Sequence, residues 1–218
     1  MAVPFDTIIL LTGAIEAAAL GAMLGVRAPN LAIHHVDDLA ALETLGDDEL
    51  ARARLIAFST GTIVPKALLD KVGYGAYNFH PGPPTYPGWG PAYFALHDGT
   101  GLFGVTAHVM IERVDAGPIV DVAMFDIPPA ATASQLERMT FLRLTRLFAD
   151  LARRLTQPDP LSIMPVAWSG RKSTRCQLEA LMATACPALA EAAPARARTR
   201  KLPVRPVAAS KTRLAYPA

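Results

Sequence analysis

Strand-like and helix-like segments alternate through the first 60 residues, and this alternation constrains the fold more than any other feature. Short apolar runs at residues 7–11, 31–36 and 55–59 have the length of buried strands, and longer, helical runs at 14–24 and 39–53 separate them. The order strand, helix, strand, helix, strand predicts a parallel sheet with right-handed crossovers. We read the apolar run 8–26 as a buried strand, a turn and a buried helix, because Glu16 interrupts it and no basic cluster precedes it.

Further along the chain, the pattern predicts a fourth strand and then an antiparallel pair. We expect a short helix at 65–71, a strand at 75–79, a stiff Pro/Gly-rich loop at 81–91, a helix at 92–98 and two strands at 104–112 and 118–127. The turn at 113–117 joins the last two strands. The predicted fold class is α/β, with a mostly parallel sheet flanked by helices and a C-terminal antiparallel strand pair.

A long amphipathic helix follows, with N-cap candidates at Thr132 and Ser134, and Ser134 with Glu137 forms a predicted capping box. Its expected core face is Leu136, Met139, Leu144, Leu147, Phe148, Leu151 and Leu155. We assign residues 1–157 to a catalytic domain and 158–186 to a short appendage with a strand at 162–168 and a helix at 175–184.

The last 32 residues, 187–218, form a basic Pro/Ala-rich tail. They hold seven Lys or Arg and one Glu, which leaves 14 basic against 18 acidic residues in the rest of the chain. We expect this tail to be disordered or extended, and its scarcity of stacking aromatics disfavours nucleic-acid binding. Cys176 and Cys186 suggest neither a disulfide framework nor a zinc site, so we expect a cytoplasmic protein without a metal. From the interrupted apolar run 8–26 we also expect no membrane segment.

Three polar side chains suit acyl transfer: Asn78 and His80 in Tyr-Asn-Phe-His-Pro-Gly, and Asp115 in Val-Asp-Ala-Gly-Pro. Residues two apart on a strand point to one face, so Asn78 and His80 can converge on one substrate atom. A carboxamide donates to an oxyanion, an imidazole relays a proton, and a nearby carboxylate favours the protonated imidazole. The competing interpretation is that all three are caps at strand ends and turns.

The segment 55–127 resembles the formyltransferase family, which uses 10-formyltetrahydrofolate, and the related formyltetrahydrofolate hydrolases. The resemblance rests on Tyr-Asn-Phe-His-Pro followed by Tyr-Pro-Gly at 86–88, on Gly-Val-Thr-Ala-His-Val-Met at 104–110, and on Val-Asp-Ala-Gly-Pro-Ile-Val at 114–120. It also rests on the 35-residue step from His80 to Asp115.

This resemblance implies a Rossmann-like catalytic domain, with Asn78, His80 and Asp115 as the catalytic trio and 10-formyltetrahydrofolate as cosubstrate. It implies a folate pocket lined by Phe58, Ser59, Thr60, Gly61, Thr62 and Ile63. Candidate substrate-binding residues are Tyr86, Trp89, Thr106 and His108, with packing inside the loop as the alternative for Tyr86 and Trp89 and a core role as the alternative for His108.

The acceptor of the formyl group is less constrained. Leu-Thr-Gly-Ala-Ile-Glu at 11–16 has one glycine, and Glu16 would repel a phosphate there, which disfavours a ribonucleotide. About 60 residues follow Pro158, too few for the tRNA-binding barrel of methionyl-tRNA formyltransferases. We therefore expect a small amine such as an amino sugar.

Water as acceptor, giving a formyltetrahydrofolate hydrolase, is the first alternative. A folate- or partner-binding protein without catalysis is the second. Homo-oligomerisation stays open.

Overall fold

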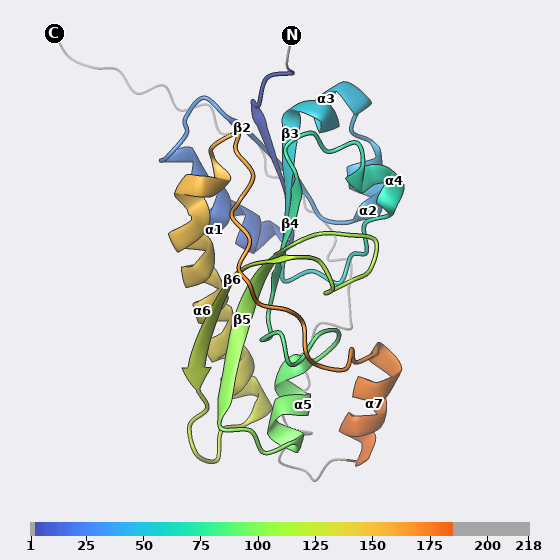
Figure 1. The fold of residues 1–218 in the computed structure, drawn as a ribbon, viewed down its shortest axis with the longest axis vertical. Helices are drawn as coiled ribbons and strands as arrows, with labels where there is room; N and C mark the ends of the chain where they lie inside the picture. Colours follow the sequence, from blue (N-terminus) through green and yellow to red (C-terminus); the bar gives the residue numbers. More distant parts are fainter. Residues whose placement is uncertain (1–2, 185–218) are drawn as a thin grey trace, which may run out of the picture.

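A single six-stranded sheet organises the molecule, as the computed structural model of residues 3–184 shows (Figure 1). Its strands lie in the order β2-β1-β3-β4-β5-β6. β1 to β4 are parallel to one another, and β5 and β6 run antiparallel to their neighbours. The strands are β1 (Thr7–Leu11), β2 (Ala32–Val36), β3 (Ala53–Phe58), β4 (Ala76–His80), β5 (Leu102–Val109) and β6 (Ile119–Asp126). The predicted α/β class with a C-terminal antiparallel pair is confirmed.

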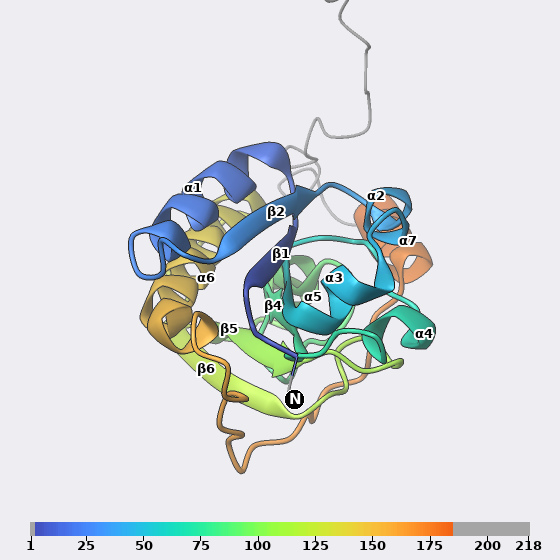
Figure 2. The same ribbon diagram turned by 90° about the horizontal axis from the view of Figure 1, so that it is seen from above.

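Helices cover both faces of the sheet, as the view from above shows (Figure 2). The helices are α1 (Ala14–Gly25), α2 (Leu39–Glu43), α3 (Asp47–Arg52), α4 (Lys66–Leu69), α5 (Pro91–His97), α6 (Ala133–Leu155) and α7 (Arg175–Thr184). On one face α1 and α6 share a buried cluster with β1, β3, β4 and β5. On the other face Leu42 of α2 and Leu50 of α3 pack with the opposite side chains of β1 and β3. Because helices cover both faces of the sheet, every residue of β1 and β3 is buried, and most of these residues are apolar.

The helix α6 begins at Ala133, so its N-cap is Thr132, one of the two candidates in the sequence. Its capping box is formed by Thr132 and Gln135, whose side chain and backbone groups bond reciprocally. The predicted Ser134 and Glu137 box is therefore wrong, because the chain is already helical at Ala133. Six of the seven expected core residues of this helix are buried, and Met139 packs partly buried against a smaller cluster.

Three other expectations differ from the structure. The helix predicted over 39–53 is two helices, α2 and α3, because Gly46 forms an extended N-cap between them. The helix α1 is buried on one side only, and its Ile15 is 86% exposed. Residues 162–168 are not a strand: Met164 donates one backbone hydrogen bond to Ile119 at the edge of β6, and no ladder follows.

The strand β4 does extend to His80, the condition for Asn78 and His80 to share a face.

Within residues 3–184, no helix is long and apolar enough to cross a membrane. The tail predicted at 187–218 lies outside the described residues.

Candidate functional site

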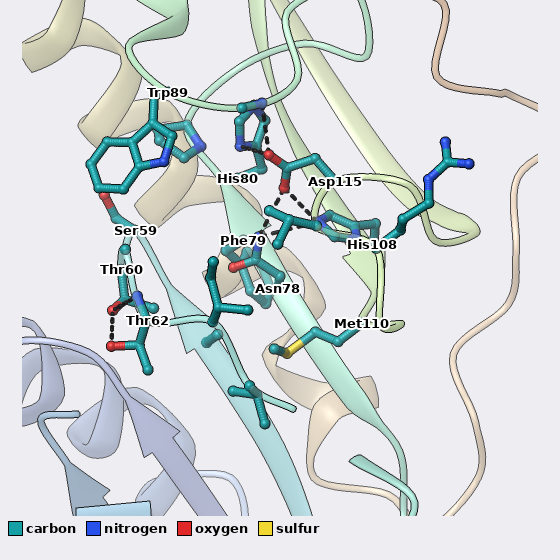
Figure 3. A pocket seen from close by; sticks show the side chains of 18 of the residues that line it. Ser59, Thr60, Thr62, Asn78, Phe79, His80, Trp89, His108, Met110 and Asp115 are labelled. Atoms are coloured by element: carbon teal, nitrogen blue, oxygen red, sulfur yellow. Dashed lines mark hydrogen bonds and ion pairs between the residues drawn. The ribbon is translucent and has the colours of Figure 1, made fainter. Parts of the chain in front are cut away.

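One cavity collects the three side chains that the sequence singled out. Asn78 and His80 enter it from the carboxyl end of β4, and Asp115 enters it from the turn between β5 and β6 (Figure 3). The cavity has a volume of about 250 Å³ and lies beyond the ends of the parallel strands, where open α/β sheets bind their ligands. The tertiary structure therefore brings together residues that are 37 positions apart in the sequence.

The carboxylate of Asp115 lies between two imidazoles. Its Oδ2 is 3.4 Å from Nδ1 of His80, and its Oδ1 is 3.3 Å from Nε2 of His108. It also accepts a 2.8 Å hydrogen bond from the backbone N–H of Gly88, in the Pro/Gly-rich loop. Asp115 adopts a left-handed backbone conformation, with φ 49°, which aims its side chain back at the sheet. The turn, the loop and two strands are thus joined through one buried carboxylate.

The backbone carbonyls around the histidines decide which ring nitrogens carry protons. A carbonyl oxygen can only accept, so Nε2 of His80 donates to Tyr86 O at 3.0 Å and Nδ1 of His108 donates to Val109 O at 2.9 Å. In the neutral rings the remaining nitrogens, Nδ1 of His80 and Nε2 of His108, have lone pairs beside Asp115. One additional proton on either nitrogen makes a charge-assisted hydrogen bond to the carboxylate. The cluster can therefore hold one transferable proton.

The side-chain amide nitrogen of Asn78 has two acceptors within reach. Its nitrogen Nδ2 lies 3.1 Å from Nε2 of His108 and 3.5 Å from Oδ1 of Asp115. The second contact is at the limit of a hydrogen bond and is the weaker of the two. A substrate oxyanion in the cavity can accept one amide hydrogen while the bond to His108 keeps the amide in place.

Burial dominates the proton affinity of His80. Loss of water lowers the pKa of this imidazole below its ordinary value, against the opposing attraction of Asp115 and the hydrogen bond to Tyr86. The carboxylate does favour the protonated form, as expected, but it is the smaller effect. Burial raises the pKa of Asp115, yet the contact with His108, the His80 ring and the Gly88 N–H together outweigh it and leave that pKa below its ordinary value.

A loop after β3 lines the opposite wall of the cavity. Ser59, Thr60, Gly61, Thr62 and Ile63 all border it. Ser59 has φ 46°, a conformation that costs a residue with a side chain about 1 kcal/mol or more and often marks a functional site.

Two aromatic residues near this loop differ in their surroundings. Phe58 lies in the core against Phe79 and Phe148 rather than in the cavity, because its side chain points to the face of the sheet that α1 and α6 cover. Trp89 borders the cavity, and an added Cβ on Gly61 would lie 2.9 Å from its ring.

Tyr86 and Thr106 lie outside the cavity. The hydroxyl of Tyr86 donates to Asp98, and desolvation together with that bond raises the pKa of Tyr86 to about 12. Thr106 is fully buried and donates to Gly82 O at 2.8 Å, which anchors the loop that follows His80. Both residues support the Pro/Gly-rich loop, and of the four candidate substrate-binding residues only Trp89 and His108 border the cavity.

A second cavity of about 330 Å³ adjoins the first. The two share Ser59, Pro81, Gly90 and Pro91 as walls. Its far side is formed by α6, which contributes Glu137, Arg138, Thr140 and Phe141. No sequence motif indicated this cavity, because its lining residues come from three separate segments of the chain, none of which forms a polar motif by itself.

Within residues 3–184, no group of three or more His, Cys, Asp or Glu side chains is arranged to hold a metal ion.

Comparisons with known proteins agree with the geometry. Residues 48–143 match the sequence pattern of the family described as formyl transferase. A methionyl-tRNA formyltransferase of Listeria welshimeri is 34% identical over 109 residues, which are 50% of this chain and 33% of that protein. The chain thus spans about a third of the length of such curated relatives.

Solved structures of formyltransferases share the fold. A sugar N-formyltransferase from Shewanella superposes with a TM-score of 0.64 at 19% identity, covering 81% of this chain and 79% of that one. A formyltransferase from Anoxybacillus kamchatkensis, in complex with a UDP-linked formamido sugar and tetrahydrofolate, gives 0.61 at 15% identity, covering 80% and 88%. The resemblance to formyltransferases and the Rossmann-like fold that it implied are confirmed.

Proposed function

We propose that this chain, whose residues 48–143 carry the formyl transferase pattern, moves the formyl group of 10-formyltetrahydrofolate to the amine of a small molecule. The observation that carries the proposal is the convergence of Asn78, His80 and Asp115 in one cavity, opposite the loop 59–63 with its backbone groups and short side chains. All three residues lie within the matched segment.

In this reaction the amine attacks the formyl carbon and the carbonyl oxygen becomes an oxyanion. Asn78 donates an amide hydrogen to that oxygen. The attacking nitrogen loses a proton, which the cluster of His80, His108 and Asp115 takes up and returns to the folate nitrogen as the C–N bond breaks. No step needs a metal ion or a covalent enzyme intermediate.

The loop 59–63 and Trp89 would hold the pterin and benzoyl rings of the folate. A wall of backbone groups and short side chains can bond the polar edge of a pterin, and an exposed indole can pack on an aromatic ring. Arg113 and Lys172 also border this cavity, and they suit the negatively charged glutamate end of a folate. The solved relative that contains tetrahydrofolate supports this part of the proposal.

The second cavity is the proposed entrance for the acceptor. It shares Ser59 and Pro81 as walls with the cavity that holds the trio. Its other side carries Glu137 and Arg138, which supply a negative and a positive charge for binding a polar amine. The N-terminus of α1 is a poor phosphate site, because the Glu16 carboxylate lies beside Gly13, where an added Cβ would be 2.6 Å from it. These features favour an amino sugar over a phosphate-anchored ribonucleotide, and the sugar-specific relatives support that choice.

Release of tetrahydrofolate from 10-formyltetrahydrofolate tests the proposal, with a panel of nucleotide-linked amino sugars and simple amines. We expect release to depend on one amine class and to fall by about 100-fold or more in Asn78→Ala, the usual cost of losing an oxyanion donor. His97→Gln on the exposed end of α5 is the matched control. Amine-independent release would instead identify a hydrolase, and folate binding without turnover would contradict catalysis altogether.

A further inference from the structure

A tryptophan beyond the matched segment contacts three parts of the candidate site at once. Trp168 follows α6 by 13 residues, and its indole N–H donates to Gly117 O at 2.8 Å, in the turn that carries Asp115. Its ring lies 5.0 Å from the ring of His108 and 5.7 Å from that of His80, both edge to face. No motif in the sequence pointed to this residue.

The segment around Trp168 is fixed on both sides. Before it, Leu161 is buried in the main core and its N–H donates to the Tyr77 hydroxyl. After it, the N–H groups of Ser169 and Gly170 both donate to Pro84 O. An added Cβ on Gly170 would lie 1.7 Å from Thr85 O, so only glycine permits this approach. Figure 1 shows the segment running from α6 past β6 and β5 to α7.

The same segment also holds the loop that faces the cavity. Ser173 exchanges backbone hydrogen bonds with Pro87 and Trp89, and its hydroxyl donates to Trp89 O at 2.7 Å. Gly88, between those two residues, is the donor to Asp115. Residues 161–174 therefore hold the loop, the turn and both imidazoles, and Trp168 is the side chain that reaches the rings.

We propose that Trp168 is a positioning residue for the site, holding the planes of His80 and His108 and the turn of Asp115 in the arrangement that proton transfer requires. This inference rests on the proposed function. Aromatic rings at such separations have preferred edge-to-face geometry, so the indole restrains both imidazoles. Its bulk also keeps water from them: His80 is 3% exposed and His108 is 2% exposed.

The effect of removing the indole follows from what else faces His80. The charged or titratable groups that act on its imidazole are Asp115 in the turn and His108 on β5, beside the carbonyl of Tyr86 in the loop. Without the indole, water reaches both rings, and the burial that lowers the pKa of His80 is partly relieved. We expect the imidazoles to rotate more freely and proton transfer to slow, with little change in folate contacts.

Two substitutions and one control test the proposal. Trp168→Ala removes the ring and the donor, Trp168→Phe keeps a ring but loses the N–H, and Ile163→Ala changes a half-exposed side chain of the same segment. We expect kcat to fall by about 10- to 100-fold in Trp168→Ala with KM for the folate within about twofold, because misplacement of catalytic groups has costs of this size. Trp168→Phe should recover part of the loss, and Ile163→Ala should match the parent.

Imidazole nitrogen resonances in the free protein provide the second readout. We expect the resonances of His80 and His108 to shift in Trp168→Ala, with the pKa of His80 moving up toward its ordinary value, while the exposed His34 and His97 stay unchanged. This measurement needs no substrate, so it still decides the positioning role if the protein proves not to transfer formyl groups.

Unchanged resonances of both buried histidines, or a kcat that stays within twofold, would overturn the proposal. A rise in KM with kcat intact would overturn it as well. If Trp168→Ala fails to fold, Trp168→Phe decides, and parental kcat and resonances in that variant count against the role.

Discussion

The carboxylate of Asp115 lies 3.3 Å from Nε2 of His108, and both side chains are buried. The contact is as close as the one to His80, so Asp115 is shared rather than dedicated to one imidazole. His108 also faces the amide of Asn78 at 3.1 Å. A residue that the sequence suggested for substrate binding therefore lies inside the hydrogen-bond network of the trio.

Replacing His108 should impair turnover more than binding. In His108→Gln the Asn78 amide and the Asp115 carboxylate both lose a fixed partner, and we expect kcat to fall by about 10- to 100-fold. KM for the folate should change much less, because the cavity wall at 59–63 is intact. Steady-state kinetics beside the His97→Gln control measures this. Equal effects in both variants would place His108 outside the mechanism.

Acidification should destabilise the protein partly through His80. Its pKa is below the ordinary value of about 6.5 in the folded state, so the unfolded state binds the proton more readily. The stability that this group contributes is complete above that value and is lost as pH falls below it. Asp115, whose folded pKa is also lowered, adds a second loss that starts only below about pH 3.8.

The free energy of unfolding by urea at pH 7.0, 6.0 and 5.0 measures this effect. We expect a smaller decline in His80→Gln than in the parent chain, because the variant lacks the titrating imidazole. Parallel curves for the two proteins would contradict the assignment to His80.

Arg54 should be critical for stability rather than for activity. Its buried guanidinium on β3 donates to the carbonyls of Leu155 and Gln157 at 2.7 Å each and of Asp159 at 2.9 Å, which caps the end of α6. Burial lowers the pKa of Arg54, against the attraction of Tyr77 and Asp159. Arg54→Met leaves these carbonyls without a donor and should cost about 3 kcal/mol or more of unfolding free energy.

Chemical denaturation of Arg54→Met beside Arg52→Met tests this role. Arg52 is a suitable control because its side chain is 43% exposed and its ion pair with Asp6 is at the surface. Comparable stability losses in the two variants would show that the buried bonds contribute little.

Ser59 should respond oppositely to two substitutions. Glycine adopts φ 46° freely, so Ser59→Gly should raise stability by about 1 kcal/mol, whereas the β-branched Ser59→Val should lower it by at least as much. The freer loop in Ser59→Gly should also weaken folate binding, because Ser59 borders both cavities. Thermal unfolding and calorimetric titration with 5-formyltetrahydrofolate measure the two effects. A glycine variant that is less stable than the parent would show that the backbone there is not strained.

Local pattern was enough to predict most of the sheet and the shared face of Asn78 and His80. The apolar runs of β1 and β3 have strand length, and the two-residue spacing of Asn78 and His80 places them on one face wherever β4 extends that far. The helix α6 was visible in its 3.6-residue period, although its exact start at Ala133 was not, since Thr132 and Ser134 offer similar caps.

The amino-acid sequence by itself determined the alternation of strands and helices up to β6, the position of Asn78 and His80 at the end of β4, and the family pattern around Asp115. Only the tertiary structure decided that His108 shares the carboxylate, that burial outweighs Asp115 in setting the pKa of His80, and that Trp168 packs on both imidazoles. The physical reason is the distance along the chain over which each effect acts. Periodicity and turn chemistry act between neighbours in the chain, whereas burial and side-chain contacts depend on which distant segments pack together.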